Sequence, residues 1–524
     1  ARCDFWYQMS QPIFRFERPD DLEILEETRL SVAVIIACRG GQDKLDLTLA
    51  SIAAQSYPSK LVNVYVIDDG SEPALKLPKI KPAKTKIITL KNSNIWGKTA
   101  VTNAATANLK EDVLWFVDAD MVFDPDHLAH HMKWHHDADD YAVLGWKRFV
   151  KEWSYTPASL KKSLDNSEFL DLHEEHWGKE LWETRSDKTN DLRSPGIEGF
   201  RNFVGATFSI TNKNWKLLGG YNPDLVTGED VELGYRIQQA GFRTVIDRQA
   251  HSWHLGYSTY EKYAEELKRH NDPALAQYIA EQRTTRERST HRFKVSTYEV
   301  VVDARSCTLK QLLEHKAELL SLSGTQAEFI VLGNWSDLKK RYTPTQDHFA
   351  DLRELHAWLK GDSQFKFVEL ASDAHLTIEE ILDLYANNAT PIRIYVEGDF
   401  KLSLKDLVAH LRITEQGLLG LVNEADKRAF AVLNSSLARA RRTKGDVYAN
   451  ISEQFGMHWM IYNDNYEKTY KKLSADSGIK HTVTARGMRY LKRELRKVNS
   501  PAQLMAFVKK SLKIVKKRLL SNGR

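Results

Sequence analysis

Two aspartates, Asp118 and Asp120, interrupt the apolar stretch 113–123, which reads VLWFVDADMVF. A carboxylate in an apolar segment either loses its charge or finds a partner, because an unpaired charge is costly to remove from water. The two residues are two positions apart, so at the end of an extended strand their side chains point the same way. Two hard oxygen ligands on one side suit Mg²⁺ or Mn²⁺ bound together with substrate phosphates. The alternative interpretation is a turn that carries exposed acids.

A second acidic pair, Glu229 and Asp230, follows Thr227 and Gly228 in TGEDVELGYRIQQAG. The apolar spacing after this pair predicts a helix that ends before Gly241. Thr227 and Asp230 have the spacing of a capping box, which predicts a structural role for the start of the helix. The same placement suits catalysis, because the positive end of a helix favours an ionised carboxylate that can accept a proton. The sequence leaves both interpretations open.

Two histidines, His251 and His254, follow a strand-like segment in RTVIDRQAHSWHLG. An imidazole could complete a site begun by carboxylates, and a nitrogen ligand favours Mn²⁺ over Mg²⁺. A single histidine is more often structural. We expect both residues just beyond the end of this strand.

Strands that alternate with helices must position these residues. Four short runs have the composition of buried strands, at 31–37, 62–67, 85–90 and 113–118. Helical spacing between them indicates a parallel α/β sheet, in which ligands bind beyond the carboxyl ends of the strands. Asp68 and Asp69, like Asp118 and Asp120, follow such ends. The two aspartate pairs should therefore face one crevice.

A second series of strand and helix patterns follows the charged segment 283–291, which we interpret as a linker. Its strands are predicted near 298–304, 327–333 and 392–400, and their order resembles the first series, as in a degenerate internal copy. The sequence VEGDF at the end of the last strand lies where an aspartate pair would, but no GED-like element or histidine pair follows it. We therefore expect a second domain that is not catalytic. The predicted domains are 1–285, 290–455 and 456–524.

The composition fits a soluble globular protein of two or three domains, with 524 residues, 42% of them hydrophobic and 28% charged. No apolar run approaches the ~18 residues of a membrane span. The first 21 residues contain acids and arginines without the apolar core of a signal peptide. Three scattered cysteines, Cys3, Cys38 and Cys307, argue against a disulfide framework or a zinc site, so we expect a cytoplasmic protein.

The positive charge belongs to the C-terminal tail. The net charge is +5, and Arg486–Arg524 contains thirteen Lys and Arg against one acid, Glu494, so the tail carries +12 and the remainder 5 − 12 = −7. Leucines and valines share one helical face of Leu504–Leu520 and lysines the other, which predicts a basic amphipathic helix on an anionic membrane. An oligomerisation helix or a solvated face are the alternatives. No nucleic-acid-binding motif accompanies this charge, so nucleic acid is not an expected partner.

Taken in order, six segments resemble an inverting glycosyltransferase of the GT-A fold in glycosyltransferase family 2: SVAVIIACRGG, VIDDGSEP, VDADMVF, GATFSI, TGEDVELGYRIQQAG and HSWH. The resemblance covers about residues 30–257. The TGED element is also similar to the glycine-glutamate-aspartate motif of galactosyl- and N-acetylgalactosaminyltransferases and of chondroitin-type polymerases. The resemblance implies a Rossmann-like, mostly parallel α/β sheet flanked by helices. A second, degenerate GT-A-like α/β domain and a basic helical C-terminus would follow.

The resemblance also implies a donor site for a UDP-sugar. Asp69 would hydrogen-bond the uracil, and Ala37 and Arg39 would frame the base. Lys98 and Asn103, from KTAVTNAA, carry over as donor-binding residues.

The remaining motif residues carry over to the metal and the acceptor. Asp118 would contact the ribose or the metal, and Asp120 would bind the metal. His254 is implied as a further metal ligand, with His251 as the second choice. Asp230 would be the catalytic base, and Glu229 would hold the acceptor.

We therefore expect a metal-dependent, inverting glycosyltransferase that uses Mn²⁺ or Mg²⁺. It would move a sugar from UDP to a glycan, a teichoic-type polymer or a lipid-linked acceptor, with docking on the inner face of the cell membrane left open. A bifunctional processive polymerase and a non-catalytic sugar-nucleotide-binding scaffold are the alternatives. A nucleotidyltransferase is disfavoured because ACRGGQDK is a poor triphosphate loop. Self-association stays open.

Overall fold

The fold is that of a computed structural model. It describes residues 18–89, 97–151, 153–166, 181–256, 263–288, 292–371, 374–386, 388–463 and 466. The chain divides into two compact units, residues 1–461 and 462–524, and the first unit contains both β-sheets. The basic helix predicted for Leu504–Leu520 lies outside the described residues.

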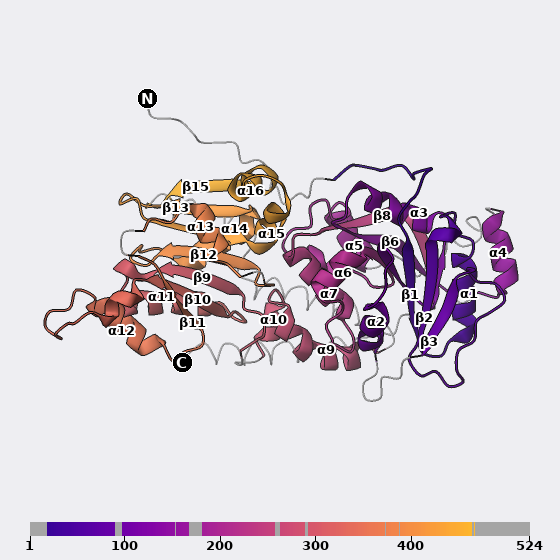
Figure 1. Ribbon diagram of the computed structural model, residues 1–524, viewed down its shortest axis with the longest axis horizontal. Coiled ribbons are helices and arrows are strands. Elements are labelled where there is room, and N and C mark those ends of the chain that lie inside the picture. The colour runs from indigo at the N-terminus through magenta and orange to yellow at the C-terminus, as the bar shows by residue number, and fades with distance from the viewer. Residues whose placement is uncertain are drawn as a thin grey trace, which may run out of the picture. The chain divides into compact units, whose positions relative to one another are not determined.

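Among the described residues, eight strands form the first sheet, in the order β3-β2-β1-β4-β7-β6-β8-β5 (Figure 1). The strands β1 to β4 are parallel, β7 runs antiparallel to both β4 and β6, β8 is parallel to β6, and β5 is antiparallel to β8. Their bounds are β1 (Val32–Cys38), β2 (Val62–Asp68), β3 (Thr85–Thr89), β4 (Val113–Asp118), β5 (Met121–Phe123), β6 (Tyr141–Val150), β7 (Thr207–Thr211) and β8 (Arg243–Leu255).

Helices cover both faces of this sheet. Alternate residues of β1 enter different cores: Val34 packs with Leu45 of α1 and the apolar side of α3, whereas Ile35 shares its core with α2, α6 and Leu233 of α7. The period of two in a strand explains this alternation. The helices are α1 (Gln42–Ile52), α2 (Lys98–Thr106), α3 (His127–Asp137), α4 (Pro157–Asp165), α5 (Leu181–Lys188), α6 (Asn212–Leu218), α7 (Glu229–Gln239), α9 (Ala264–Tyr278) and α10 (Arg283–Arg286).

The parallel register brings the predicted acids to one edge of the sheet. Ala37 of β1 lies opposite Asp118 of β4, and Cys38 lies opposite Asp68 of β2. The three strands therefore end at the same level, which is the arrangement that places ligands beyond carboxyl ends in α/β sheets.

A second sheet of seven described strands has the order β11-β10-β9-β12-β14-β13-β15 (Figure 1). The strands are β9 (Tyr298–Asp303), β10 (Ala327–Gly333), β11 (Phe365–Glu369), β12 (Ile392–Glu397), β13 (Leu418–Val422), β14 (Arg428–Leu433) and β15 (Met457–Ile461). The helices between them are α11 (Leu309–Leu320), α12 (Ala350–Leu359), α13 (Ile378–Asp383), α14 (Leu404–Thr414), α15 (Asn434–Arg442) and α16 (Val447–Phe455).

The two sheets have the same topology apart from β5. The parallel set β11, β10, β9 and β12 corresponds to β3, β2, β1 and β4, and the antiparallel β14 corresponds to β7. A detail of the backbone repeats as well: the Asn212 amide donates to the Asp112 carbonyl just before β4, and the Asn434 amide donates to the Pro391 carbonyl just before β12. The predicted fold class, a GT-A-like α/β sheet followed by a second α/β domain of the same kind, is confirmed.

The segment predicted as a linker begins with α10. The guanidinium of Arg286, which is fully buried, donates hydrogen bonds to the carbonyls of Ala276 and Val295. This part of the segment is therefore packed against its neighbours.

Helices and loops that belong to the two halves of the chain also contact one another. Arg412 of α14 forms a bidentate pair with the buried carboxylate of Glu281, with N–O distances of 2.8 and 2.9 Å. Gly241, in a left-handed conformation after α7, lies so close to the backbone of Arg439 in α15 that any side chain there would overlap it. The three domain boundaries predicted from the sequence stay predictions.

Within the part of the chain that the structure describes, no helix combines the length and the apolar character needed to cross a bilayer.

Candidate active site

A cavity of about 940 Å³ opens at the carboxyl ends of β1, β2 and β4. The starts of α2 and α7 and one side of α9 complete its wall. Nine residues predicted from the sequence line it: Ala37, Arg39, Asp69, Lys98, Asp118, Asp120, Glu229, Asp230 and His254.

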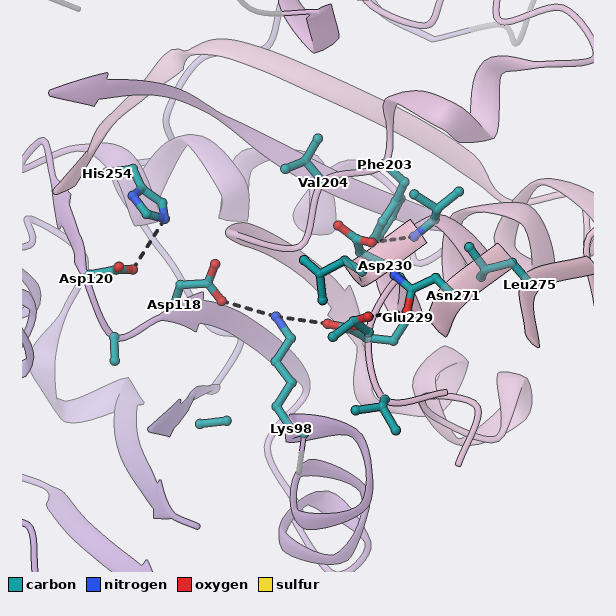
Figure 2. Close-up of a pocket in the computed structure, with 18 of the residues that line it drawn as sticks. Lys98, Asp118, Asp120, Phe203, Val204, Glu229, Asp230, His254, Asn271 and Leu275 are labelled. Atoms are coloured by element: carbon teal, nitrogen blue, oxygen red, sulfur yellow. Dashed lines mark hydrogen bonds and ion pairs between the residues drawn. The ribbon is translucent and has the colours of Figure 1, made fainter. Parts of the chain in front are cut away.

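Three of these residues could hold a metal ion. Asp118, Asp120 and His254 each offer a ligand atom, and these atoms all lie within 4.8 Å of one another. His254 lies within β8 rather than beyond it, where it faces Met121 of the antiparallel strand β5. Since Met121 directly follows Asp120, this pairing brings the imidazole to the aspartate, with 3.4 Å between His254 Nε2 and Asp120 Oδ1 (Figure 2).

The surroundings of His254 fit a metal ligand. Its Nδ1 lies 3.2 Å from the Gly256 carbonyl oxygen, a contact that places the proton on Nδ1 and leaves the Nε2 lone pair directed at Asp120. Burial lowers the pKa of His254, so the ring is neutral as a ligand must be. Burial also raises the pKa of Asp120, against the influence of His254. A cation among these groups would stabilise the ionised form of Asp120 against the effect of burial. Two carboxylates and one imidazole suit Mn²⁺.

His251 does not join this group. It is three residues from His254, an odd spacing that directs the two side chains to opposite faces of β8. It is absent from both the ligand group and the cavity lining.

Asn103 also lies outside the cavity lining. Its side-chain amide donates to the Tyr221 carbonyl at 2.7 Å, and its oxygen accepts the Tyr221 amide hydrogen at 2.9 Å. These two bonds fasten α2 to the turn after α6.

The two adjacent aspartates of β2 have different places. Asp68 is buried, and its carboxylate accepts the amide hydrogens of Ser71 and Leu75. Asp69 lines the cavity together with Ala37 and Arg39. The expectation that all four strand-end aspartates face the crevice is therefore wrong for Asp68. Its carboxylate instead holds the loop that follows β2.

The start of α7 differs from the predicted capping box. Gly228 occupies the N-cap position in a left-handed conformation with a φ of 78°, and no side chain caps the helix. The Thr227 hydroxyl donates instead to the Asn271 side-chain oxygen in α9. Thr227 lies one residue too early to cap, because the helix begins at Glu229. The Asp230 carboxylate accepts the amide hydrogens of Gly205, at 3.2 Å, and of Val231, at 2.7 Å.

Lys98 connects the two acidic pairs. Its ammonium lies 3.1 Å from Asp118 Oδ1 and 3.2 Å from Glu229 Oε1 (Figure 2). Burial opposes the charge on Lys98, but Asp118 and Glu229 together raise its pKa above the usual value. Burial raises the pKa of Glu229, Lys98 opposes that shift, and the neighbouring Asp230 adds to it.

The far wall of the cavity was not predicted from the sequence. It contains an aromatic residue, two arginines and two residues of α9: Trp182, Arg185, Arg201, Asn271 and Leu275. They come from segments without a motif, and only the helical spacing of α9 hinted that some of them share a face. Asn271 and Leu275 of this wall lie on the side of Asp230, away from Asp120 and His254 (Figure 2). The cavity thus extends from the ligand group to Asp230 and the far wall.

Comparisons with known proteins point to glycosyltransferases. Residues 29–272 match the family model described as glycosyltransferase like family 2. Over 270 residues the chain is 25% identical to uncharacterized glycosyltransferase YfnE of Bacillus subtilis. The aligned region covers 46% of this chain and 68% of YfnE. Over 233 residues the chain is 23% identical to polypeptide N-acetylgalactosaminyltransferase 3 of Drosophila melanogaster. This second aligned region covers 40% of this chain and 32% of that enzyme.

Among solved structures, the chain is similar to the mannosyltransferase PcManGT from Pyrobaculum calidifontis, in complex with GDP-Man and Mn²⁺. The two are 17% identical, with 53% of this chain and 69% of that chain covered and a TM-score of 0.34. The segment that matches the family model contains the whole of the first sheet and ends before β9.

Proposed function

We propose that this chain, which is a glycosyltransferase, moves a hexose from a UDP-sugar to a hydroxyl group with inversion of the anomeric carbon and with the help of a divalent cation. The acceptor would be a glycan, a teichoic-type polymer or a lipid-linked sugar. One observation carries the proposal: the ligand group of Asp118, Asp120 and His254 shares a cavity with the carboxylate of Asp230.

The ligand group would hold the cation together with the donor diphosphate. A bound divalent cation stabilises the negative charge that grows on a leaving diphosphate. Asp118 and Asp120 supply anionic oxygens, and His254 supplies a neutral nitrogen whose orientation is set by the Gly256 carbonyl.

Asp230 would act as the base. Its carboxylate accepts the proton of the acceptor hydroxyl while the acceptor oxygen forms a bond to the anomeric carbon. The bond from that carbon to the phosphate oxygen breaks, and its electron pair leaves with UDP. A single displacement of this kind inverts the anomeric centre. The amide hydrogen of Gly205 supports the assignment because it orients the carboxylate towards the cavity.

Glu229 would hold the acceptor beside this base. Its side chain is 9% exposed, and its contact with Lys98 ties the acceptor side of the cavity to Asp118 on the donor side. The assignment of uracil to Asp69, Ala37 and Arg39 comes from the family resemblance. Their common position on the cavity wall supports it.

A scaffold without chemistry is the weaker alternative, because such a protein has no need for the carboxylate at Asp230 together with a complete ligand group. The sequence of the basic tail, outside the described residues, favours work at the cytoplasmic face of an anionic membrane.

The test is a panel of UDP- and GDP-sugars offered with Mn²⁺, Mg²⁺ or a chelator. We expect hydrolysis or transfer from one UDP-sugar that stops with the chelator, and a product whose anomeric configuration, read by NMR, is opposite to that of the donor. A retained configuration would contradict inversion. Undiminished turnover in the chelator would contradict the metal, and selective use of a GDP-sugar would contradict the uracil assignment.

A further inference from the structure

The second sheet contains a counterpart of the metal site. In the first sheet the register of β1 and β4 ends with Ala37 opposite Asp118. In the second, the register of β9 and β12 ends with Asp303 opposite Glu397. Glu397 therefore corresponds to Asp118, and Asp399, two residues later, corresponds to Asp120.

The residues that face these acids differ between the two sheets. The pairing of β4 with β7 sets Val117 opposite Thr207, and the pairing of β12 with β14 sets Val396 opposite Ala429. The two residues before Thr207 are Gly205 and Ala206, and those before Ala429 are Lys427 and Arg428. Two small residues at the first site thus become two long cations at the second.

In the first site these two small residues contribute no charged side chain. A side chain at Gly205 would come within 3.1 Å of Asp230 Cβ and 3.6 Å of Lys98 Nζ. A side chain at this position would crowd Asp230, whose carboxylate accepts the Gly205 amide hydrogen.

In the second site the long cationic side chains of Lys427 and Arg428 contact the acids. Lys427 Nζ lies 3.6 Å from Glu397 Oε2 and 3.3 Å from Asp399 Oδ2, so one ammonium contacts both acids. Arg428 Nε lies 3.4 Å from Glu397 Oε1, and Arg305 Nη2 lies 2.7 Å from Asp303 Oδ2. The three acids thereby meet three cations.

The base has a counterpart too, with another task. The helix α16 follows β14 and α15 as α7 follows β7 and α6. Gly445 and Asp446 precede its first residue, Val447, whereas α7 follows Gly228 and begins with two acids and a valine. Asp446 is exposed, and its carboxylate caps α16 by accepting the Ala449 amide hydrogen at 2.7 Å. The sequence pattern alone did not predict a GED-like element at this position.

We propose that Lys427 takes the place of the divalent cation in a duplicated, catalytically silent site. Its ammonium and the guanidinium of Arg428 together neutralise the acid pair from within the chain, so the site needs no metal and offers no net positive charge to a diphosphate. The second domain then contributes no transfer reaction, which argues against two active centres in one chain. The inference uses the proposed function only as the pattern for comparison.

Mn²⁺ binding in the presence of UDP, measured by electron paramagnetic resonance, tests the proposal on the full chain. The Asp120→Ala variant disables the first site and should bind no Mn²⁺. Adding Lys427→Met to this variant removes the internal cation and should create a new Mn²⁺ site that raises the thermal unfolding temperature when the ion is added. The matched control is Lys401→Met in the same background, which removes an exposed lysine two residues after Asp399 and should bind none.

Two results would overturn the proposal. One is a Mn²⁺ site in Asp120→Ala that disappears when Asp399→Ala is added, since the second site would then be open to metal. The other is a Lys427→Met double variant that folds, as judged by circular dichroism, yet binds no more Mn²⁺ than the Lys401→Met control. Lys427→Gln replaces Lys427→Met if the latter does not fold. Failure of the unmodified chain to bind Mn²⁺ would contradict the proposed function alone, because neither arm uses the first site.

Discussion

The ammonium of Lys98 lies 3.2 Å from the carboxylate of Glu229, and it reaches Asp118 on its other side at 3.1 Å. One lysine at the start of α2 thus joins the ligand group to the start of α7. Among the described residues, Lys98 thus links an acid of the ligand group directly to an acid at the start of α7.

Replacing Lys98 should change the pH dependence of turnover. Burial and Asp230 raise the pKa of Glu229, and Lys98 holds it down. In Lys98→Met that restraint is gone, so the pKa of Glu229 rises and its ionised form is lost at a higher pH. The acidic limb of the kcat/KM profile should move to higher pH, whereas Lys98→Arg should restore most of its position. An acidic limb that is the same in both variants and in the unmodified enzyme would show that Glu229 does not titrate in this range.

Asp230→Asn should keep the fold and UDP-sugar binding but lower kcat by at least ~10²-fold, the usual contribution of a positioned base. Calorimetry with UDP measures the binding, and initial rates measure the turnover. Asp272→Asn is a matched control, because Asp272 lines the same cavity but pairs with Arg288. Near-normal turnover in Asp230→Asn would leave Asp230 with the backbone contacts as its only role.

Asp120→Ala should abolish the metal-dependent part of UDP binding, since it removes an oxygen ligand of the cation that would hold the diphosphate.

His254→Ala should weaken Mn²⁺ binding more than Mg²⁺ binding, because it removes the nitrogen ligand that favours Mn²⁺. Titration calorimetry with each ion checks both variants. His251→Ala is the control and should retain both ions, because its side chain lies outside the ligand group. Equal losses for His251→Ala and His254→Ala would contradict this assignment.

The stability of the chain should fall steeply in weak acid because of three buried histidines. His127, His131 and His135 lie at intervals of four residues on one face of α3, and their rings bond the hydroxyls of Thr207 and Ser209. Burial lowers the pKa of His127 and His135 to about 3 and that of His131 well below its usual value. The unfolded chain binds these protons near pH 6.5 and the folded chain does not.

The free energy of unfolding should therefore decrease as the pH falls from about 6.5 towards 3, by about 1.4 kcal/mol per pH unit for each histidine. Urea denaturation between pH 7.5 and 5 measures this slope. His135→Gln should make it shallower by one proton, whereas the exposed control His270→Gln should leave it unchanged. An unaltered slope in His135→Gln would mean that this imidazole is protonated in the folded chain.

Deleting residues 504–524 should leave transfer to a small acceptor intact, since every residue assigned to the cavity precedes them. It should weaken binding to vesicles that contain anionic lipid, because each basic group near such a surface contributes about 1 kcal/mol. Cosedimentation at low and high salt measures the effect, which salt should screen. Vesicle binding that survives the deletion would place the membrane contact elsewhere, and a changed molecular mass in light scattering would make the tail an assembly element.

The sequence predicted the elements whose pattern is local. The β-branched runs before Asp68 and Asp118 and the apolar spacing after Asp230 were sufficient to predict β2, β4 and α7. Placing Asp118 and Asp120 together required only the two-residue spacing at a strand end. What a strand's own pattern determines could be predicted.

Other features depend on which strands become neighbours, and no local pattern contains that information. The role of His254 follows from the antiparallel pairing of β8 with the short strand β5, and the Asn271 contact of Thr227 follows from the position of α9. The cations at Lys427 and Arg428 acquire meaning only when β14 is aligned with β7. In the sequence they are two ordinary charged residues before a strand.

The helix α7 has one end at the candidate active site and the other against α15. It begins with Glu229 and Asp230 at the cavity, and the glycine that ends it, Gly241, touches the backbone of Arg439. Asp230, the proposed base, thus lies on a helix whose far end packs against α15. Excising the first sheet as a minimal enzyme would free that end and expose Glu281 without Arg412, so a truncated protein should keep its motif residues and lose the alignment of Asp230 with the donor. If the second site is silent as proposed, the second half of the chain would still serve to hold the proposed base in place.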